Sequence, residues 1–136
     1  MINSRSLDDL TVEVRLLCAK FIVACAAQNI DVLITSTYRD KESQDAIYRQ
    51  GRTSPGKKVT NAKAGFSYHN YRVAFDFVPI VNGKAMWNDL ETFKKCGAIA
   101  ESLGLEWAGN WNSFPELAHC QYTQGKRIND YMKEAE

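Results

Sequence analysis

The chain has 136 residues, of which 45% are hydrophobic and 24% are charged, and its formal net charge is +1. This length and composition are typical of one globular domain with one hydrophobic core, so we expect a single domain over residues 1–136. The near balance of charge argues against nucleic acid as the main ligand, because duplex binding needs a strongly basic surface. No stretch approaches the roughly 20 apolar residues of a membrane-spanning helix, so no membrane insertion is expected.

The N-terminal segment lacks the apolar centre of a secretory signal, since Asp8 and Asp9 lie where it would be. We therefore expect synthesis in the cytoplasm, with release by another factor if the protein acts elsewhere. In that compartment the cysteines are expected to be reduced and to serve as small buried side chains. There are four of them: Cys18, Cys25, Cys96 and Cys120.

The first predicted elements are a helix, a strand and a second helix. A capping box at Ser6 and Asp9, followed by apolar residues at helical spacing, predicts a helix that ends near Asn29. The short β-branched run 32–37 predicts a strand. Residues 41–50 predict another helix, because a glycine closes this mainly polar segment.

The middle of the chain combines a long loop with a predicted hairpin. Residues 52–66 are basic, contain glycine and proline and show no periodicity. A loop of this length inside a small domain is uncommon unless it has a function. Residues 73–80 are rich in strand-forming residues and precede Asn82-Gly83, which is a strong signal for a tight hairpin turn.

The last third predicts helix, strand and helix. Asn88 and Glu91 form a second possible capping box, for a helix that runs to Leu103. Residues 117–122 predict a final strand, and residues 128–136 a helical tail. The expected fold class is therefore α+β, with helices on one side of a small antiparallel sheet.

The candidate site consists of the only two histidines and two nearby carboxylates. His69 precedes Asp76 by seven residues, and His119 follows Glu116 by three. A catalytic zinc site needs three nitrogen or oxygen ligands and an open position for water. His69, Asp76 and His119 could supply those ligands, which leaves Glu116 free to accept a proton from water. The alternative, that both histidines are simply packed or exposed side chains, stays open at this point.

The separations of His69 from Asp76 and of Glu116 from His119 both restrict the backbone conformation. A separation of seven would place His69 and Asp76 on opposite faces of one regular strand, so the chain must turn between them, most naturally at residues 70–72. Asp76 is then expected inside a strand and His69 on the loop that enters it. By the same argument His119 should lie in a strand and Glu116 in the turn before it.

At these residues the sequence resembles a known family. Residues 67–76, SYHNYRVAFD, resemble the SxHxxGxAxD motif of zinc D-alanyl-D-alanine carboxypeptidases, and residues 116–119, ELAH, resemble the second motif of that family. The similarity extends over roughly residues 30–122. The upstream residues are similar to the L-alanyl-D-glutamate endopeptidase branch, which contains bacterial cell-wall enzymes and phage endolysins; these are Ser36, Thr37, Tyr38, Arg39, Gln44, Tyr48, Gly51 and the run 55–57.

The resemblance implies a fold of the hedgehog and D,D-peptidase type and assigns roles by position. His69, Asp76 and His119 would bind Zn²⁺, and Glu116 would act as general base and then general acid. Arg39 would hold a substrate carboxylate or stabilise the oxyanion.

Other residues have more open assignments. The resemblance would place Ser67 near the metal as a supporting hydrogen-bonding group. Trp111, with Trp87 and Trp107, could line a substrate groove, although tryptophans in a small domain are often core residues. The motif usually has glycine where this chain has Arg72, which would be strained if the position requires a positive φ.

The resemblance implies a peptidoglycan peptidase that cleaves the L-alanyl-D-glutamate bond of the stem peptide, with lysines 57, 58 and 63 as possible aids to Arg39. We expect a monomeric phage or prophage endolysin, made in the cytoplasm and released to the wall through a holin-type protein. A D,D-carboxypeptidase or D,D-dipeptidase with the same machinery is the first alternative. A non-catalytic zinc domain that binds the wall is another. A cysteine hydrolase is disfavoured, because Cys120 and His119 are adjacent and would face opposite sides of a strand.

Overall fold

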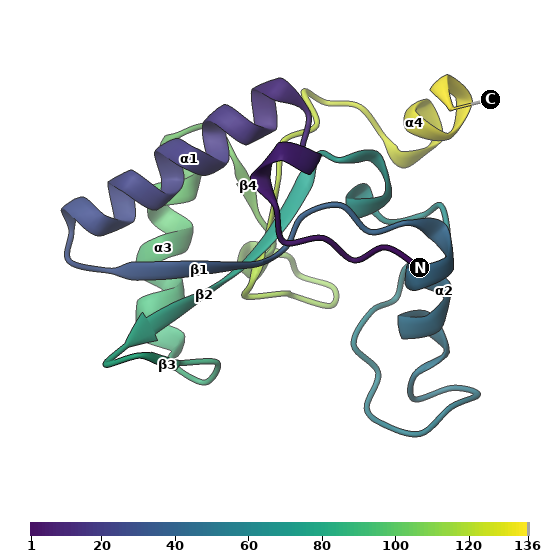
Figure 1. The fold of residues 1–136 in the computed structure, drawn as a ribbon, viewed down its shortest axis with the longest axis horizontal. Coiled ribbons are helices and arrows are strands. Elements are labelled where there is room, and N and C mark those ends of the chain that lie inside the picture. The colour runs from purple at the N-terminus through teal and green to yellow at the C-terminus, as the bar shows by residue number, and fades with distance from the viewer. Residues whose placement is uncertain (136) are drawn as a thin grey trace.

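The centre of the fold is a five-stranded antiparallel sheet, as seen in the computed structural model, which describes residues 1–135 (Figure 1). Four strands follow the order β1-β2-β5-β4, and β3 pairs with β2 as a short hairpin. The strands are β1 (Asp31–Ser36), β2 (Ala74–Val81), β3 (Lys84–Ala85), β4 (Glu106–Trp107) and β5 (His119–Gln121). The predicted α+β class is confirmed.

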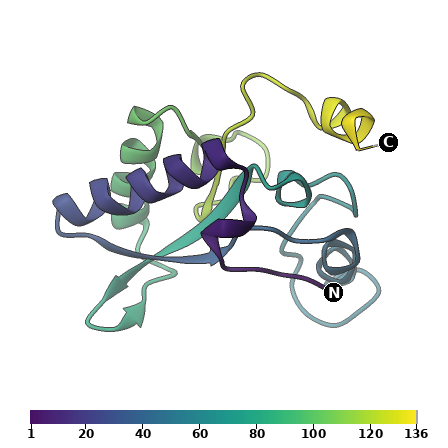
Figure 2. The same ribbon diagram turned by 45° about the horizontal axis from the view of Figure 1, so that its top comes forward.

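Residues 1–135 form four α-helices: α1 (Val12–Ala27), α2 (Lys41–Arg49), α3 (Leu90–Ser102) and α4 (Ile128–Glu134). Helices α1 and α3 contact each other and the sheet. Helices α2 and α4 lie apart from that pair, at the opposite end of the molecule, in both Figure 1 and Figure 2. The expectation that the helices share one side therefore holds only for α1 and α3. Residue 136 of the predicted helical tail lies outside the described residues.

The core forms between these two helices and the middle strand. Phe75 and Phe77 of β2 are fully buried and pack against Phe21 of α1, with ring centroids 5.6 and 4.9 Å away. Phe77 also packs against Phe93 of α3 at 5.5 Å. Because side chains alternate along a strand, Asp76 points to the opposite face. One face of β2 thus contributes phenylalanines to the core, and the other face contributes Asp76 to the site.

Of the predicted helix starts, the first is wrong by several residues and the one at Asn88 by one residue. Ser6 caps only a short 3₁₀ turn, η1 (Leu7–Asp9), and α1 begins at Val12, where the Thr11 hydroxyl accepts from the backbone of Val14. Helix α3 is capped by Asp89, whose carboxylate accepts from the backbone of Thr92. In both cases the cap is another residue able to accept the hydrogen bond, so composition alone did not select the right one.

The register of the sheet lines up the polar residues of its open face. A β-bulge between Ile34 and Ser36 brings Ser36 opposite Asp76, and Asp76 is also opposite His119. The next row pairs Gln121 with Glu106 on β4. Bulges often redirect a side chain near an active site, and this one turns the end of β1 toward the histidines.

All four cysteines are buried free thiols, as expected from the sequence. Among residues 1–135, no helix combines the length and apolar character that crossing a membrane would require.

Candidate metal centre

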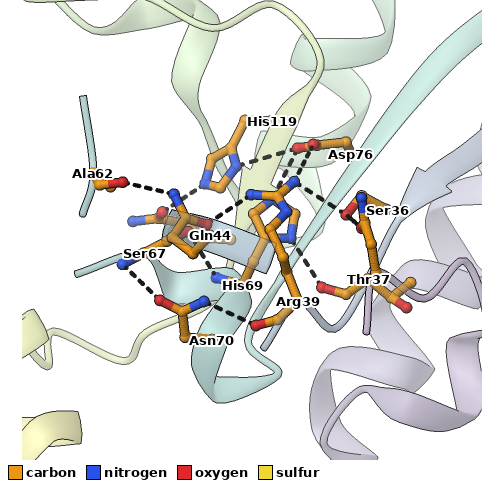
Figure 3. Close-up of polar contacts among 12 residues, drawn as sticks. Ser36, Thr37, Arg39, Gln44, Ala62, Ser67, His69, Asn70, Asp76 and His119 are labelled. Atoms are coloured by element: carbon orange, nitrogen blue, oxygen red, sulfur yellow. Dashed lines mark hydrogen bonds and ion pairs between the residues drawn. The ribbon is translucent and has the colours of Figure 1, made fainter. Parts of the chain in front are cut away.

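Three potential ligand side chains, from His69, Asp76 and His119, converge on the open face of the sheet (Figure 3). One ligand atom from each lies within 4.8 Å of the others. Asp76 Oδ1 is 3.0 Å from His69 Nε2 and 3.3 Å from His119 Nδ1. The three residues form a metal-binding triad, in the combination that spacing alone suggested.

His69 reaches the triad because the chain turns between it and Asp76. It lies in the 3₁₀ turn η2 (Tyr68–Tyr71), which leads directly into β2. Its Nδ1 donates to the backbone oxygen of Thr37 at 2.9 Å, which leaves Nε2 facing Asp76. The Ser67 hydroxyl accepts from the His69 backbone N–H at 3.2 Å, so Ser67 supports the turn through the backbone.

His119 is the first residue of β5 and presents its other nitrogen to the triad. Its Nδ1 faces Asp76, while its Nε2 lies 2.8 Å from Gln121 Oε1. The ring of Trp111 lies against it, with centroids 5.6 Å apart. Both histidines are buried, at 2% exposure for His69 and 7% for His119, and their rings meet edge to face.

The electrostatics of the triad favour an ionised carboxylate. Burial by itself raises the pKa of Asp76, but the charges and hydrogen bonds of His69 and His119 outweigh it and hold that pKa far below its ordinary value. Burial lowers the pKa of His69. For His119 burial acts in the same direction, but the hydrogen bond and charge of Asp76 reverse it and raise the pKa. The triad therefore offers one anionic carboxylate oxygen and two imidazole rings. These are ligand types that a divalent cation such as zinc binds.

Glu116 lies in the turn before β5, as the spacing predicted. Its backbone is held at both sides, by Ala108 O at 3.1 Å and by the N–H of His119 at 3.3 Å. The side chain is partly buried in the same cleft as the triad. Burial raises its pKa, with the Asp76 charge acting in the same direction and His119 and Arg39 opposing it. A carboxylate with a raised pKa is suited to accept and return a proton near neutral pH.

Arg39 follows β1 and lies over the second oxygen of Asp76, with Nη2 3.6 Å from Oδ2. Its Nη1 donates to Gln44 Oε1 at 2.9 Å and its Nη2 to Ser36 Oγ at 3.2 Å. Its Nε is buried and has no hydrogen-bond partner among residues 1–135. Burial lowers the pKa of the guanidinium, while the Asp76 and Glu116 charges raise it.

A cleft of about 570 Å³ joins these groups. The long loop supplies part of its wall, and Gln44 ties that loop to the site by donating to Ala62 O at 2.7 Å. The lining residues from the loop are Val59, Thr60, Asn61, Ala62 and Phe66. The position of residues 52–66 beside the cleft gives a reason for the length of this loop.

Several predicted contributors lie elsewhere. Lysines 57, 58 and 63 are not among the residues that line the cleft. Trp111 lines it, but Trp107 is a core residue and Trp87 is exposed outside it. Cys120 is fully buried on the core side of β5, where strand alternation predicted it.

Arg72, which replaces the usual glycine, adopts the backbone that a glycine would favour. It ends η2 with φ +66° and ψ +24°, in the left-handed region. Its guanidinium stacks on Tyr38 at 3.8 Å and donates to Asp9 O at 3.0 Å. The turn therefore has a left-handed residue at this position, and side-chain contacts outside the site hold the arginine there.

Sequence reasoning missed Gln121 and Thr37 as supports of the two histidines. Gln121 could have been found, because residue i+2 on a strand shares the face of residue i. Thr37 acts through its backbone oxygen, so its side chain carried no signal. Its backbone is held in turn by the N-terminal segment, where its N–H donates to Ser4 O at 2.8 Å.

The donor set fits a catalytic metal better than a structural one. Two imidazole nitrogens and one carboxylate oxygen are a recurrent zinc set, and such a site keeps a position for water. Among residues 1–135, the triad contains no fourth His, Cys, Asp or Glu. His69 and His119 each have a hydrogen bond on the nitrogen turned away from Asp76, as metal-binding histidines usually do.

Solved structures share this fold. The crystal structure of the L-Ala D-Glu endopeptidase ChiX of Serratia marcescens matches with a TM-score of 0.66 and 19% identity, over 96% of this chain and 92% of that one. At this identity the match shows the fold alone.

Sequence comparison adds a similarity to one family of peptidases. The model of the D-alanyl-D-alanine carboxypeptidase family matches residues 60–122, which contain the whole triad. The peptidoglycan L-alanyl-D-glutamate endopeptidase CwlK of Bacillus subtilis is 38% identical over 107 residues, 72% of this chain. An L-alanyl-D-glutamate peptidase of Listeria phage A118 is 35% identical over 99 residues, 71% of this chain. The chain spans 64% of the first protein and 32% of the second. These matches show that the chain is similar to the peptidase M15 family.

Proposed function

We propose that this protein is a zinc-dependent peptidase that hydrolyses the L-alanyl-D-glutamate bond of peptidoglycan stem peptides. The observation that carries the proposal is the triad itself, whose ligand atoms lie within 4.8 Å of one another on a cleft that also holds Glu116 and Arg39. The names of the two relatives indicate the bond.

Zinc is the metal we propose for the triad, because two imidazoles and one carboxylate form a typical catalytic zinc set. Bound there, zinc would polarise the scissile carbonyl and make a bound water more acidic. The three side chains would hold it in a cleft that is open to substrate.

Glu116 would perform the proton transfers. Its carboxylate accepts a proton from the attacking water as the new C–O bond forms, and then passes it to the nitrogen of the leaving amine as the C–N bond breaks. The raised pKa of Glu116 supports this double role, since the group then loses and regains a proton more readily near neutrality.

Arg39 would bind an anionic oxygen of the substrate or of the tetrahedral intermediate. Its Nε–H is unpaired within the described chain, and its Nη atoms are fixed by Gln44 and Ser36. A guanidinium that is already held in place loses little freedom when it binds, and it stays charged in a partly dry cleft. The α-carboxylate of D-glutamate is a candidate partner.

A lytic role in a phage life cycle, with release to the wall by a holin-type protein, is a further part of the proposal. The Listeria phage relative supports it. Expression with and without a holin-type protein should show lysis of the host only in the first case. Equal lysis in both would contradict it.

The decisive experiment is digestion of purified muropeptides, followed by identification of the new termini by mass spectrometry. The expected product has a new D-glutamyl amino terminus, and the same protein treated with a chelator should produce none. Free D-alanine would instead indicate the carboxypeptidase alternative. Wall binding without any new terminus would indicate the non-catalytic alternative.

A further inference from the structure

A continuous chain of hydrogen bonds extends from the nitrogen of His119 that faces away from Asp76. His119 Nε2 lies 2.8 Å from Gln121 Oε1, and Gln121 Nε2 donates to Glu106 Oε2 at 2.9 Å. The indole Nε1–H of Trp111 donates to the same Glu106 oxygen at 3.1 Å. These residues come from β5, from β4 and from the segment after η3 (Ala108–Asn110).

Glu106 sets the direction of every bond in this chain. An ionised carboxylate only accepts hydrogen bonds, so the NH₂ group of Gln121 must face Glu106. The carbonyl oxygen of Gln121 then faces His119 and can only accept. His119 must therefore carry its hydrogen on Nε2, and a neutral imidazole with Nε2–H has its lone pair on Nδ1. Nδ1 is the nitrogen that faces Asp76 Oδ1.

The surroundings hold the chain in this arrangement. Gln121 is only 3% exposed, and its partner Glu106 is directly opposite it in the sheet. The Trp111 ring packs against the His119 ring at 5.6 Å, while its N–H holds Glu106. The same indole therefore restrains both ends of the chain.

We propose that Gln121, oriented by Glu106 and Trp111, is a positioning residue that fixes the His119 tautomer and presents Nδ1 to the metal. The inference rests on the proposed metal site. The two histidines would then bind through different nitrogens, because the Thr37 backbone oxygen fixes His69 with Nε2 free. The tautomer of His69 is fixed by a backbone oxygen, whereas that of His119 depends on the side chain of Gln121.

The first test is the zinc affinity of Gln121→Met, which keeps the side-chain length and removes the amide. We expect affinity to fall about 10- to 100-fold, the usual effect of losing such a support. Gln28→Met is the matched control, since Gln28 is exposed at the end of α1, and it should bind zinc like the wild type. Competition with a chromogenic chelator measures the affinity without any peptide. Unchanged affinity in Gln121→Met would overturn the proposal.

A second variant reverses the bond between residues 121 and 106 and keeps an acceptor for His119. In Gln121→Glu/Glu106→Gln, the carboxylate at 121 accepts from His119 Nε2–H and from the NH₂ group at 106, while Trp111, which shares Glu106 Oε2 with Gln121 in the wild type, loses this acceptor. We expect zinc affinity at least 10-fold tighter than that of Gln121→Met, close to the wild-type value. If the double variant is as weak as Gln121→Met although both are folded by circular dichroism, an acceptor at residue 121 does not position His119 and the proposal fails.

Nitrogen NMR of the imidazoles in the zinc-loaded wild type tests the tautomers directly. The expected spectrum has a protonated Nε2 and metal-bound Nδ1 for His119, and the opposite assignment for His69. Zinc on Nε2 of His119 would overturn the inference. A protein that hydrolyses no stem peptide but shows these tautomers would sink the proposed activity and leave this inference standing. A wild-type protein that binds no zinc would overturn both.

Discussion

Arg72 departs from the family motif, which usually has glycine here, and has a left-handed backbone that glycine would adopt more easily. Its φ of +66° is costly for a side chain with a Cβ atom, and glycine would be unstrained there. The stacking on Tyr38 and the hydrogen bond to Asp9 O offset that cost. Because Arg72 connects η2 to β2, these contacts also hold the spacing between His69 and Asp76.

Comparing two substitutions at this position separates the backbone cost from the side-chain contacts. Arg72→Ala loses the contacts and keeps the strain, whereas Arg72→Gly loses the contacts and relieves it. We expect the glycine variant to be more stable than the alanine variant by about 1 kcal/mol. Urea unfolding measures the difference. An alanine variant as stable as the glycine variant would show that the position is not strained.

At the scale of elements, the contact between α3 and β4 helps to hold the turn that follows Glu116. A Cβ atom on Gly97 would come within 2.2 Å of Trp107 Cδ2, so the helix and the indole touch directly. The Trp107 indole N–H also donates to Leu117 O at 2.8 Å. The glycine thus lets the tryptophan reach the turn between Glu116 and His119.

Gly97→Ala tests this contact. Because the indole is buried and cannot move away freely, the added methyl should lower the free energy of unfolding by about 1–3 kcal/mol. Lys95→Ala, on the exposed side of α3, is the control and should change it by less than about 0.5 kcal/mol. Thermal or urea unfolding of both variants provides the comparison. Equal stability of Gly97→Ala and wild type would contradict the tight packing.

Much of the arrangement of elements could be predicted from local patterns. The strand at 32–37, the helix at 41–50 and the hairpin at Asn82-Gly83 were confirmed within a residue or two, because each has its own periodic or turn signal. The start of α1 was misplaced by several residues and that of α3 by one, since several neighbouring residues can cap. Strand β4 was not predicted at all, because two residues contain no pattern and pair only through tertiary structure.

The site could be predicted from local spacing only in part. Strand alternation required a turn between His69 and Asp76, and that turn is η2. The meeting of His119 with Asp76 depends on the pairing of β2 with β5, which spacing does not specify. The resemblance supplied that link. The roles of Glu116, Arg39, Ser67 and Trp111 remain predictions.

At the scale of the whole molecule, the site brings together segments that are distant in the sequence. The end of β1, helix α2, the turn η2 and strands β2 and β5 each contribute a polar side chain to the contacts in Figure 3. The N-terminal segment supports this part of the site through its backbone, since Asn3 forms an isolated antiparallel bridge with Arg39. Zinc binding to such a site should be coupled to folding, because the unfolded chain cannot present the three ligands together.

The central claim is that the triad holds the metal while Glu116 moves the proton. The most direct measurement is the zinc content and the muropeptide hydrolysis of Glu116→Gln, with His69→Ala as the control that should lose the metal. We predict that Glu116→Gln keeps zinc at the wild-type level and loses about 10²- to 10⁴-fold in rate. A Glu116→Gln protein that retains zinc and hydrolyses the L-alanyl-D-glutamate bond at the wild-type rate would contradict the account.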